Sequence, residues 1–344
     1  MSSMASGALR RSRVTVKDLA RHLGMSVSTV SRAFYDDAVI ASDTRERVLS
    51  KAAEIGYQPN PLARSLITKS SRIVGVVVSD ITNPFYPEVL TSLTEHLQTA
   101  GFNVMLVVGQ PSRPQDESVS TLLSYHPDIV LILATTLSSS ASEACRRVGT
   151  PVIFVNRAAA DEHSFSVTCD NQAGGAEVAS LFLDRGFTRL GFVAGLPDAS
   201  TNVDRWTGFA RRCAERGLSK PASSSGGVFT YEEGYKAACE LLRRRRRPEA
   251  LFCANDLLAI GAIDAARREF GLRIPDDLSI VGFDDIAMAS WPSYDLTTVR
   301  QPVADMIAKT IELTVGLTRG EERPVSAIRI PGRLIERRTT GARI

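Results

Sequence analysis

The stretch VTVKDLARHLGMSVSTVSRAF, residues 14–34, predicts two short helices joined by a tight turn. Thr15 can cap the first helix, with Asp18 three positions further on as its capping partner. Gly24 can end this helix, and Ser26 can cap the second one almost at once. The apolar side chains of the first helix recur at helical spacing, at Val16, Leu19, Ala20 and Leu23. Two short helices around a glycine turn are typical of a helix-turn-helix unit.

The second of these helices carries the residue types that read DNA. Its spacing turns Val30 and Ala33 inward and leaves Val27, Ser28 and Arg32 outward. A protruding helix fits the major groove, where base edges present distinguishable donors, acceptors and methyl groups. The outward side chains are predicted to read bases, with guanine or phosphate as alternative partners of Arg32. Further predicted DNA contacts are Thr15, Ser26, Thr29, Ser31, Thr44 and Asn60. A small helical bundle without DNA is the alternative interpretation of this pattern alone.

A third helix is predicted from Ser42 or Asp43 to Gly56, which completes a very small unit over residues 14–58. Residues 1–13 are predicted to form a disordered tail. Residues 1–70 carry 11 Lys and Arg against 6 Asp and Glu, whereas the rest of the chain carries 30 basic and 32 acidic side chains. A small basic head on a nearly neutral body indicates that the head binds a polyanion, although a solvated surface explains the charge equally well.

The segment GYQPNPLARSLIT, residues 56–68, follows the third helix. Its prolines end that helix, and a short helix over 61–67 is predicted to form only against a partner. Together with the motif VIASDTRERVLSKAAEIGYQPNPLARSL, the head resembles the LacI/GalR family of bacterial transcription regulators. The resemblance implies that 59–71 is a hinge, in which Ala63 lies in the minor groove and Leu66 wedges between base pairs. Without the resemblance, Leu66 reads as an ordinary packing residue.

From Arg72 onward, short apolar runs alternate with amphipathic stretches, as in Ile73–Ser79 followed by Glu88–Thr99. This alternation predicts parallel α/β structure, and the number of strands requires two doubly wound sheets. We expect the break between them near residues 160–166. The predicted strands are Ile73–Ser79, Asn103–Val108, Ile129–Leu133, Val152–Val155, Leu190–Ala194, Ala250–Cys253 and Ser279–Gly282. The predicted helices include Glu88–Thr99, Asn171–Asp184, Arg205–Arg216, Tyr231–Arg244 and Leu257–Phe270.

The body is similar to the same family through SDITNPFY (79–86), DNQAGG (170–175), CANDLLAIGA (253–262) and SIVGFDD (279–285). The resemblance implies a two-lobed effector-binding body, like that of periplasmic sugar-binding proteins, which also forms a homodimer. It further implies three crossings between the lobes, so that a last helix near 303–320 returns to the first lobe. The predicted body is therefore 72–344, with lobes of about 72–163 plus 301–323 and 164–300 plus 324–344.

Polar side chains follow several predicted strands, where doubly wound sheets bind their ligands. The mixture of carboxylates, arginines, asparagines and aromatic rings suits a sugar or a polyhydroxylated acid. From the residues and the resemblance, the predicted effector contacts are Asp80, Asn83, Phe85, Asn156, Arg157, Asp170, Thr201, Arg205 and Asp284, with Trp291 and Gln301 as weaker candidates. Arg205 and Asp284 are the strongest, because opposite charges at two strand ends can clamp a ligand. Asn255 and Asp256 are left out, since both can simply cap the following helix.

Other classes of protein find little support. The five scattered cysteines form no C-x-x-C pair, and the four histidines have no metal-ligand spacing, so no metal or other cofactor is predicted. Nucleotide-binding and hydrolase motifs are missing, and we predict that the chain is not an enzyme. No apolar run is long enough to cross a membrane and no export signal is evident, which favours the cytoplasm. The run Arg243–Arg247 is read as a solvated helix end rather than a nucleic-acid site.

These observations predict a dimeric regulator, most simply a repressor, whose affinity for duplex operator DNA is controlled by a small polar effector. A periplasmic solute-binding protein is the alternative that the body alone suggests, but the basic head argues against it. An α/β enzyme that uses the cleft for catalysis is a second alternative, and it lacks any activated nucleophile or metal cluster. The sequence leaves open the effector, the operator, the sign of the response and the choice between dimer and tetramer.

Overall fold

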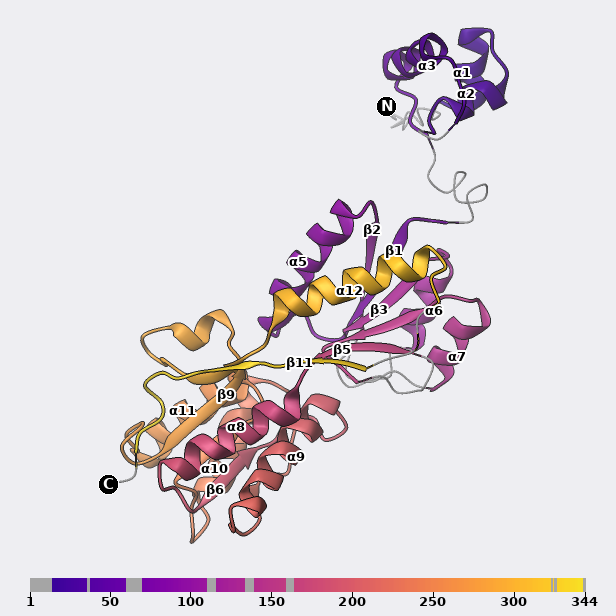
Figure 1. Cartoon of the computed structure of the whole chain (residues 1–344). Coiled ribbons are helices and arrows are strands. Elements are labelled where there is room, and N and C mark those ends of the chain that lie inside the picture. The colour runs from indigo at the N-terminus through magenta and orange to yellow at the C-terminus, as the bar shows by residue number, and fades with distance from the viewer. Residues whose placement is uncertain are drawn as a thin grey trace, which may run out of the picture. The chain divides into compact units, whose positions relative to one another are not determined.

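The computed structural model describes residues 14–35, 38–59, 70–109, 116–133, 139–158, 164–322, 324 and 327–342. The chain forms two compact units, one up to Ser71 and the other from Arg72 onward. We call the first unit the head and the second the body (Figure 1). Asn60, Ala63 and Leu66, the predicted contacts of the hinge segment, lie outside the described residues, as does the predicted tail.

The head has the three predicted helices, α1 (Val16–Leu23), α2 (Val27–Arg32) and α3 (Ser42–Ile55). Gly24 ends α1 in the left-handed conformation with φ +63°, which a side chain would strain. Among the described residues of the head, the buried apolar core consists of Leu19, Ala20, Val30, Ala33, Val48 and Ala52. A core of this size supplies little stability, so the head depends strongly on good helix caps.

The first lobe of the body is built on a six-stranded parallel sheet in the order β11-β5-β4-β3-β1-β2. Helices α5 and α12 pack against each other on one face, and α6 and α7 pack against each other on the other (Figure 1). The strands are β1 (Ile73–Val78), β2 (Asn103–Val108), β3 (Ile129–Leu133), β4 (Val152–Val155), β5 (Phe165–Cys169) and β11 (Ala327–Ile330). The helices are α5 (Phe85–Thr99), α6 (Asp116–Leu123), α7 (Ser139–Arg147) and α12 (Val303–Thr318).

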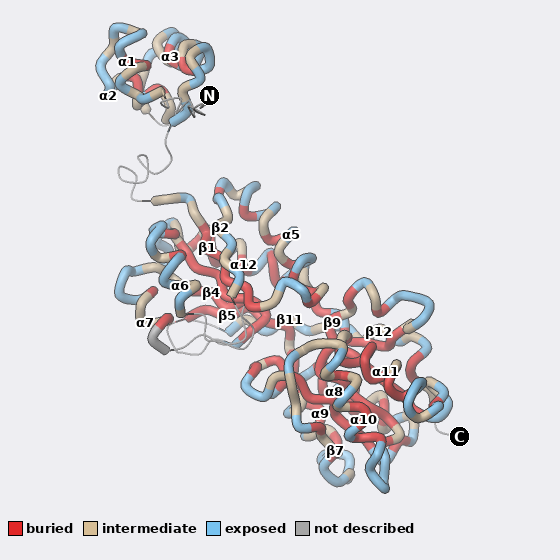
Figure 2. Tube along the Cα trace, turned by 180° about the vertical axis from the view of Figure 1, so that it is seen from behind, coloured by how far each residue is buried: buried red, intermediate tan, exposed pale blue. Residues whose placement is uncertain are grey.

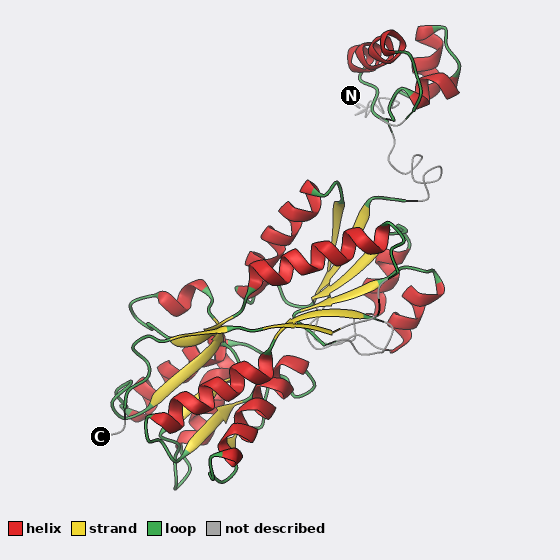
Figure 3. Cartoon of the chain, viewed as in Figure 1, coloured by secondary structure: helices red, strands yellow, loops and turns green. Residues whose placement is uncertain are grey.

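The second lobe contains another six-stranded sheet, β12-β10-β9-β8-β6-β7, in which only the β12–β10 pair is antiparallel. Helices α8 and α9 pack together, as do α10 and α11, so that the sheet lies between two helical layers (Figure 3). The strands are β6 (Leu190–Val193), β7 (Ala222–Ser223), β8 (Ala250–Cys253), β9 (Ser279–Asp284), β10 (Thr297–Arg300) and β12 (Arg333–Ile335). The helices are α8 (Asn171–Asp184), α9 (Ser200–Glu215), α10 (Tyr231–Leu242), α11 (Asp256–Phe270) and a 3₁₀ turn at Ala287–Ser290.

The predicted boundaries between the lobes are wrong at two places. Phe165–Cys169, which was assigned to the second lobe, is a strand of the first sheet, paired with both β4 and β11. Ala327–Ile330 also belongs to the first sheet, although we expected the chain to return to the second lobe at 324. The chain therefore crosses between the lobes near 170, 301 and 331, three times as predicted. All five residues of β5 are buried, although Ser166 and Thr168 are polar, because its backbone pairs with β4 and β11 and α12 packs against the strand.

The centre of each lobe is apolar, and the buried positions follow the strands (Figure 2). The middle strands β3, β4 and β8 are buried along their whole length, as expected for parallel strands covered on both faces. The five cysteines are buried free thiols, and burial raises the pKa of Cys169 to about 12. Within the described part of the chain, none of the helices combines the length and the apolar character needed to span a membrane.

Two glycines bring α8 and α9 into backbone contact. A Cβ atom at Gly175 would lie 2.2 Å from the carbonyl oxygen of Arg205, and one at Gly208 would lie 1.9 Å from that of Gln172. Neither distance is possible without a shift of a helix, because the obstacle is backbone rather than a flexible side chain. The pair of glycines therefore fixes the position of α9, which carries Arg205.

We expect Gly208→Ala to lower the free energy of unfolding of the body by about 1–3 kcal/mol, the usual cost of overpacking. Helix propensity acts in the opposite direction, because alanine is the better helix former by about 1 kcal/mol. Thr207→Ala, at the exposed neighbouring position, is the matched control. Urea unfolding followed by tryptophan fluorescence measures both variants, and a Gly208→Ala variant more stable than the parent would contradict the close packing.

Candidate functional site

The outer face of α2 presents the side chains that were predicted to read DNA. Val27 is 41 % exposed, and Ser28 and Arg32 are also exposed, whereas Val30 and Ala33 are buried in the head core. The Arg32 guanidinium donates to the Ser28 hydroxyl over 3.0 Å, one helical turn away. This bond holds two hydrogen-bonding groups side by side on the exposed face. The α2 surface thus has the polarity and the free donors that a groove-reading helix needs.

The predicted phosphate contacts divide into two groups. The hydroxyls of Thr15 and Ser26 accept bonds from the backbone of Asp18 and Thr29, so that both residues serve as helix caps. The Thr15–Asp18 pair is a complete capping box, and it holds the pKa of the Asp18 carboxyl below its usual range. Ser31 and Thr44 are partly exposed, the one on α2 and the other in the first turn of α3.

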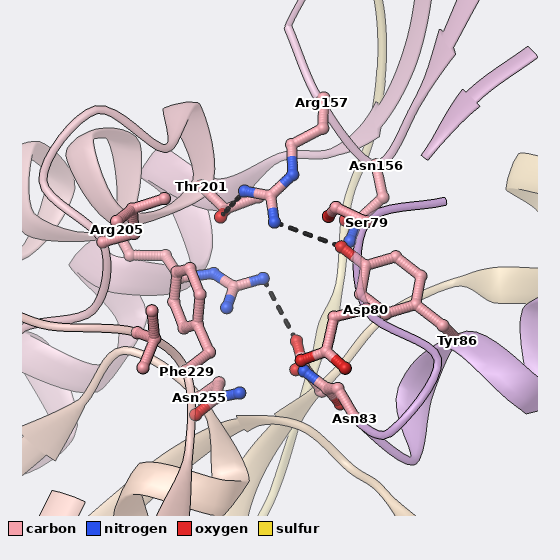
Figure 4. A pocket seen from close by; sticks show the side chains of 13 residues that line it. Ser79, Asp80, Asn83, Tyr86, Asn156, Arg157, Thr201, Arg205, Phe229 and Asn255 are labelled. Carbon is pink, nitrogen blue, oxygen red and sulfur yellow. Dashed lines mark hydrogen bonds and ion pairs between the residues drawn. The ribbon is translucent and has the colours of Figure 1, made fainter. Parts of the chain in front are cut away.

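The body contains a cleft with an empty volume of about 520 Å³, whose lining comes from both lobes (Figure 4). The first lobe contributes the residues after β1 and after β4. The second lobe contributes the residues after β6 and β8, the first turns of α9, the last residue of β9 and the segment before α10. The lining residues are Ser79, Asp80, Asn83, Tyr86, Asn156, Arg157, Leu196, Thr201, Arg205, Val228, Phe229, Asn255 and Asp284. This position, beyond the carboxyl ends of the strands, is where doubly wound sheets bind ligands.

Arg205 is the most firmly held side chain of the cleft. Its Nε donates to Asn171 Oδ1 over 2.8 Å, its Nη1 to the carbonyl oxygen of Ala254 over 2.5 Å, and its Nη2 to Asp284 Oδ1 over 3.1 Å. The guanidinium also lies 3.7 Å from the centre of the Phe283 ring, which gives a cation–π contact. Arg205 is therefore preorganised, and it presents a fixed positive charge to the cleft.

Asp284 ends β9 and carries the opposing charge. Its Oδ1 accepts from Arg205 and also from Gln301 Nε2 over 2.7 Å. Burial raises the pKa of this carboxyl, and the Arg205 guanidinium opposes that shift. The residue has φ +117°, and Asn156, across the cleft, has φ +62°. Two non-glycine residues in this uncommon region indicate local strain that surrounding contacts maintain, which is frequent at binding sites.

Arg157 joins the two lobes at the other end of the cleft. Its Nη1 donates to the Thr201 hydroxyl of the second lobe over 2.6 Å, and its Nη2 donates to the Tyr86 hydroxyl of the first lobe over 3.1 Å. Next to it, the backbone N–H of Ala158 donates to the Ser200 hydroxyl over 3.0 Å. The start of α9 is thereby bonded to the segment that follows β4.

Seven of the predicted effector contacts lie together in this cleft, namely Asp80, Asn83, Asn156, Arg157, Thr201, Arg205 and Asp284. The remaining four lie outside its lining. Phe85 is buried in the apolar core with its ring 5.5 Å from that of Tyr86, and Asp170 caps α8 by accepting from Ala173. Trp291 is 51 % exposed after the 3₁₀ turn. Gln301 lies behind Asp284 and orients its carboxylate rather than facing the cleft.

Several lining residues were not predicted. Phe85 was predicted as the contact and Tyr86 was not, because the sequence does not show which of two adjacent rings at the start of a helix faces the cleft. Asn255 was interpreted as a helix cap; it does cap α11, and its side chain also lies in the cleft (Figure 4). Val228 and Phe229 follow two glycines. Apolar side chains in a glycine-containing loop could have indicated that this loop contacts a ligand. Asp256 has a structural role, since it accepts bonds from Thr298 and from the backbone of Ile286.

The arginine run 243–247 lies at the end of a helix, as predicted. Helix α10 ends at Leu242, and Arg243–Arg247 are exposed beyond it, with Arg244 bonded to Glu240. Among the described residues, no cluster of histidine, cysteine and acidic side chains could hold a metal ion.

Comparisons with known proteins agree with both units. Residues 15–60 match the model of bacterial regulatory proteins of the lacI family, and residues 179–340 match that of a periplasmic binding protein-like domain. The chain is 30 % identical to the HTH-type transcriptional repressor CytR of Escherichia coli K12, over 89 % of this chain and 90 % of that protein. It is 31 % identical to the HTH-type transcriptional regulator DegA of Bacillus subtilis, over 95 % of this chain and 98 % of that protein.

A solved structure with the same fold is that of the transcriptional regulator CelR in complex with cellobiose. It has a TM-score of 0.71 and 26 % sequence identity, and the match covers 95 % of this chain and 100 % of that one.

Proposed function

Because this chain belongs to the LacI family of bacterial regulatory proteins, we propose that it is a transcriptional repressor controlled by a small polar effector. The observation that carries this proposal is the combination of the exposed α2 face with a polar cleft lined from two lobes. One unit has the surface to read DNA, and the other has the site to bind a metabolite. A solute-binding protein or an enzyme has no use for the first of these.

On DNA, α2 lies in the major groove, with Val27, Ser28 and Arg32 toward the base edges. The chain acts as a homodimer in the cytoplasm, and its two heads bind the two halves of a near-palindromic operator. Ser31 and Thr44, together with the N-termini of the helices, contact phosphates. This arrangement uses the outward residues of the head and leaves its small core undisturbed.

In the body, the effector lies between the lobes. Asp284 and Asp80 accept from hydroxyl groups, Asn255 and Asn83 can both donate and accept, and the rings of Tyr86 and Phe229 cover apolar faces of the ligand. These partners suit a sugar or a sugar acid, and the related regulator CelR was solved with cellobiose. The cleft binds this ligand without turnover, because its buried carboxylate, Asp284, is engaged with Arg205 and Gln301 rather than poised for proton transfer.

Control of DNA binding follows from linkage. A ligand that contacts both lobes favours one angle between them. In the homodimer, this angle determines the distance between the heads of the two subunits. The coupling free energy is typically about 1–3 kcal/mol, and it acts equally from effector to DNA and from DNA to effector. The effector therefore changes operator affinity by about 5- to 150-fold.

Selection of duplexes from a random library by the full-length protein tests the proposal. We expect a near-palindromic sequence to be enriched and then bound more tightly than scrambled duplex in a gel-shift titration. Adding sugars and sugar acids one at a time should identify a compound that changes this affinity and is recovered unaltered. If no sequence is enriched at low ionic strength, the protein is not a sequence-specific regulator. If the bound compound is converted to a product, the cleft is catalytic.

A further inference from the structure

Arg157 is a buried cation whose hydrogen-bond partners among the described residues are neutral. The side chain is 5 % exposed, and its two terminal nitrogens donate to the hydroxyls of Thr201 and Tyr86. Its Nε is buried and has no hydrogen-bond partner in the described structure. No carboxylate of the described residues lies within ion-pair distance of it, whereas Arg205 has Asp284. A guanidinium out of contact with water needs an anionic partner, since neutral hydroxyls replace only part of its hydration.

The acidic residues near the cleft do not supply this partner. Asp284 is committed to Arg205 and Gln301 through its Oδ1. Asp80 is half-exposed, and its Oδ1 accepts from the backbone and the hydroxyl of Thr82. Asp256 faces away and is bonded to Thr298 and Ile286. Among the described residues, the buried part of the cleft therefore contains the guanidinium groups of Arg157 and Arg205 and the carboxylate of Asp284, and only Arg205 is within ion-pair distance of that carboxylate.

The surroundings of Arg157 show where an added group would lie. The guanidinium is 5.7 Å from the centre of the Phe229 ring, and both side chains face the same cavity (Figure 4). Beside it, Asn156 keeps a buried side-chain oxygen without a partner among the described residues. A ligand that brings an anion to Arg157 and a hydroxyl to Asn156 satisfies both groups at once.

We propose that the effector carries an oxyanion, such as a carboxylate or a phosphate, which pairs with Arg157 in the cleft. The inference rests on the proposed effector role of the cleft and narrows the class of effector from sugars and sugar acids to polyhydroxylated anions. The planar guanidinium can offer two parallel N–H donors to such a group, and charge-assisted bonds of this kind are the strongest available to a protein. Hydroxyls at the other end of the ligand remain for Asp284 and Asn255.

Thermal unfolding of the full-length protein with matched ligands tests the proposal. The probes are ribose, ribose 5-phosphate, glucose, gluconate and glucose 6-phosphate, together with acetate and inorganic phosphate at constant ionic strength. We compare the parent, Arg157→Met, and Arg211→Met as a matched control, because Arg211 is an exposed arginine of α9 that pairs with Glu215. We expect at least one oxyanion probe to stabilise the parent and Arg211→Met saturably. Arg157→Met should bind that probe about 10- to 100-fold more weakly, with the affinity for neutral sugars unchanged.

Two further variants keep the test decisive if Arg157→Met folds poorly. Arg157→Lys retains the charge and loses the planar fork, so oxyanion affinity should fall by less than in Arg157→Met. Asn156→Asp adds a carboxylate beside Arg157, and we expect it to weaken oxyanion binding and to raise the unfolding temperature without ligand.

The proposal is overturned if no oxyanion probe distinguishes the parent from the Arg157 variants, or if neutral sugars lose affinity to the same extent. The second result would assign Arg157 a purely structural role between the lobes. Operator selection with the parent protein measures DNA binding by the head and does not depend on Arg157. A failed oxyanion test therefore rejects the proposed effector class without rejecting the proposed regulatory function. The phosphate and carboxylate probes also distinguish the two kinds of oxyanion. We expect only one kind to bind the parent saturably and to lose this affinity in Arg157→Met.

Discussion

Asp284→Asn is expected to abolish effector binding and to lower the free energy of unfolding of the body by about 3–5 kcal/mol, the usual cost of breaking a buried ion pair. The substitution removes the only carboxylate within ion-pair distance of Arg205 among the described residues, and the Arg205 side chain is 2 % exposed. An amide in this position keeps an oxygen that can accept from Arg205 and Gln301, but it has no negative charge to pair with the buried guanidinium, and its NH₂ group replaces the second carboxylate oxygen as an acceptor.

Urea unfolding followed by the fluorescence of Trp206, which packs in the core of the second lobe, measures the stability change. Asp276→Asn is the matched control, because Asp276 pairs with Arg273 at the surface and such pairs contribute less than about 1 kcal/mol. The double variant Arg205→Met with Asp284→Asn should recover part of the lost stability, since it removes the unpaired charge. Normal stability and normal effector affinity in Asp284→Asn would show that the pair is not at the centre of the site.

Arg32→Ala is expected to lower affinity for the selected operator by about 5- to 150-fold, which corresponds to about 1–3 kcal/mol for a bidentate base contact. Affinity for unrelated duplex should fall much less, because it depends on phosphate contacts distributed over the head. The head should remain folded, since Arg32 is exposed and its one bond in the described structure goes to the neighbouring Ser28 hydroxyl.

Gel-shift titrations at fixed salt, on operator and on scrambled duplex, separate the two affinities. Arg211→Ala in the body removes the same charge from a surface that does not read DNA, and it should bind the operator like the parent. An equal loss on both duplexes would make Arg32 a phosphate contact rather than a base contact. Unchanged operator affinity would reject α2 as the reading helix.

The head could be predicted almost completely because its signals are local. Thr15, Gly24 and Ser26 determine the helix ends by their own hydrogen bonds and backbone angles, which depend on residues three or four positions away. The long strands and helices of the body were also predicted, since their hydrophobic patterns are strong. Strands β5, β11 and β12 were missed, because polar or charged side chains interrupt or border their short apolar runs, and because they are held by pairing with distant segments.

The site was only partly predictable for a related reason. The principle that ligands lie beyond the ends of strands located Asp80, Asn156, Arg205 and Asp284 correctly in one cleft. It could not distinguish Asp170, whose carboxylate is used by its own helix, from carboxylates that face the cavity. Whether a side chain caps, supports or lines a site depends on its rotamer and on neighbours from other strands, which sequence spacing does not specify.

The threefold passage of the chain between the lobes has a consequence for biosynthesis. The lobe that leaves the ribosome first waits for segments near the end of the chain, because its sheet lacks β11 and one of its faces lacks α12 until these have been made. Until both have emerged, the nascent chain exposes the edge of β5 and the apolar side chains that Met306, Ile307 and Leu313 later cover. The second lobe can meanwhile assemble most of its strands in chain order, so chaperones would have their longest engagement with the amino-terminal lobe.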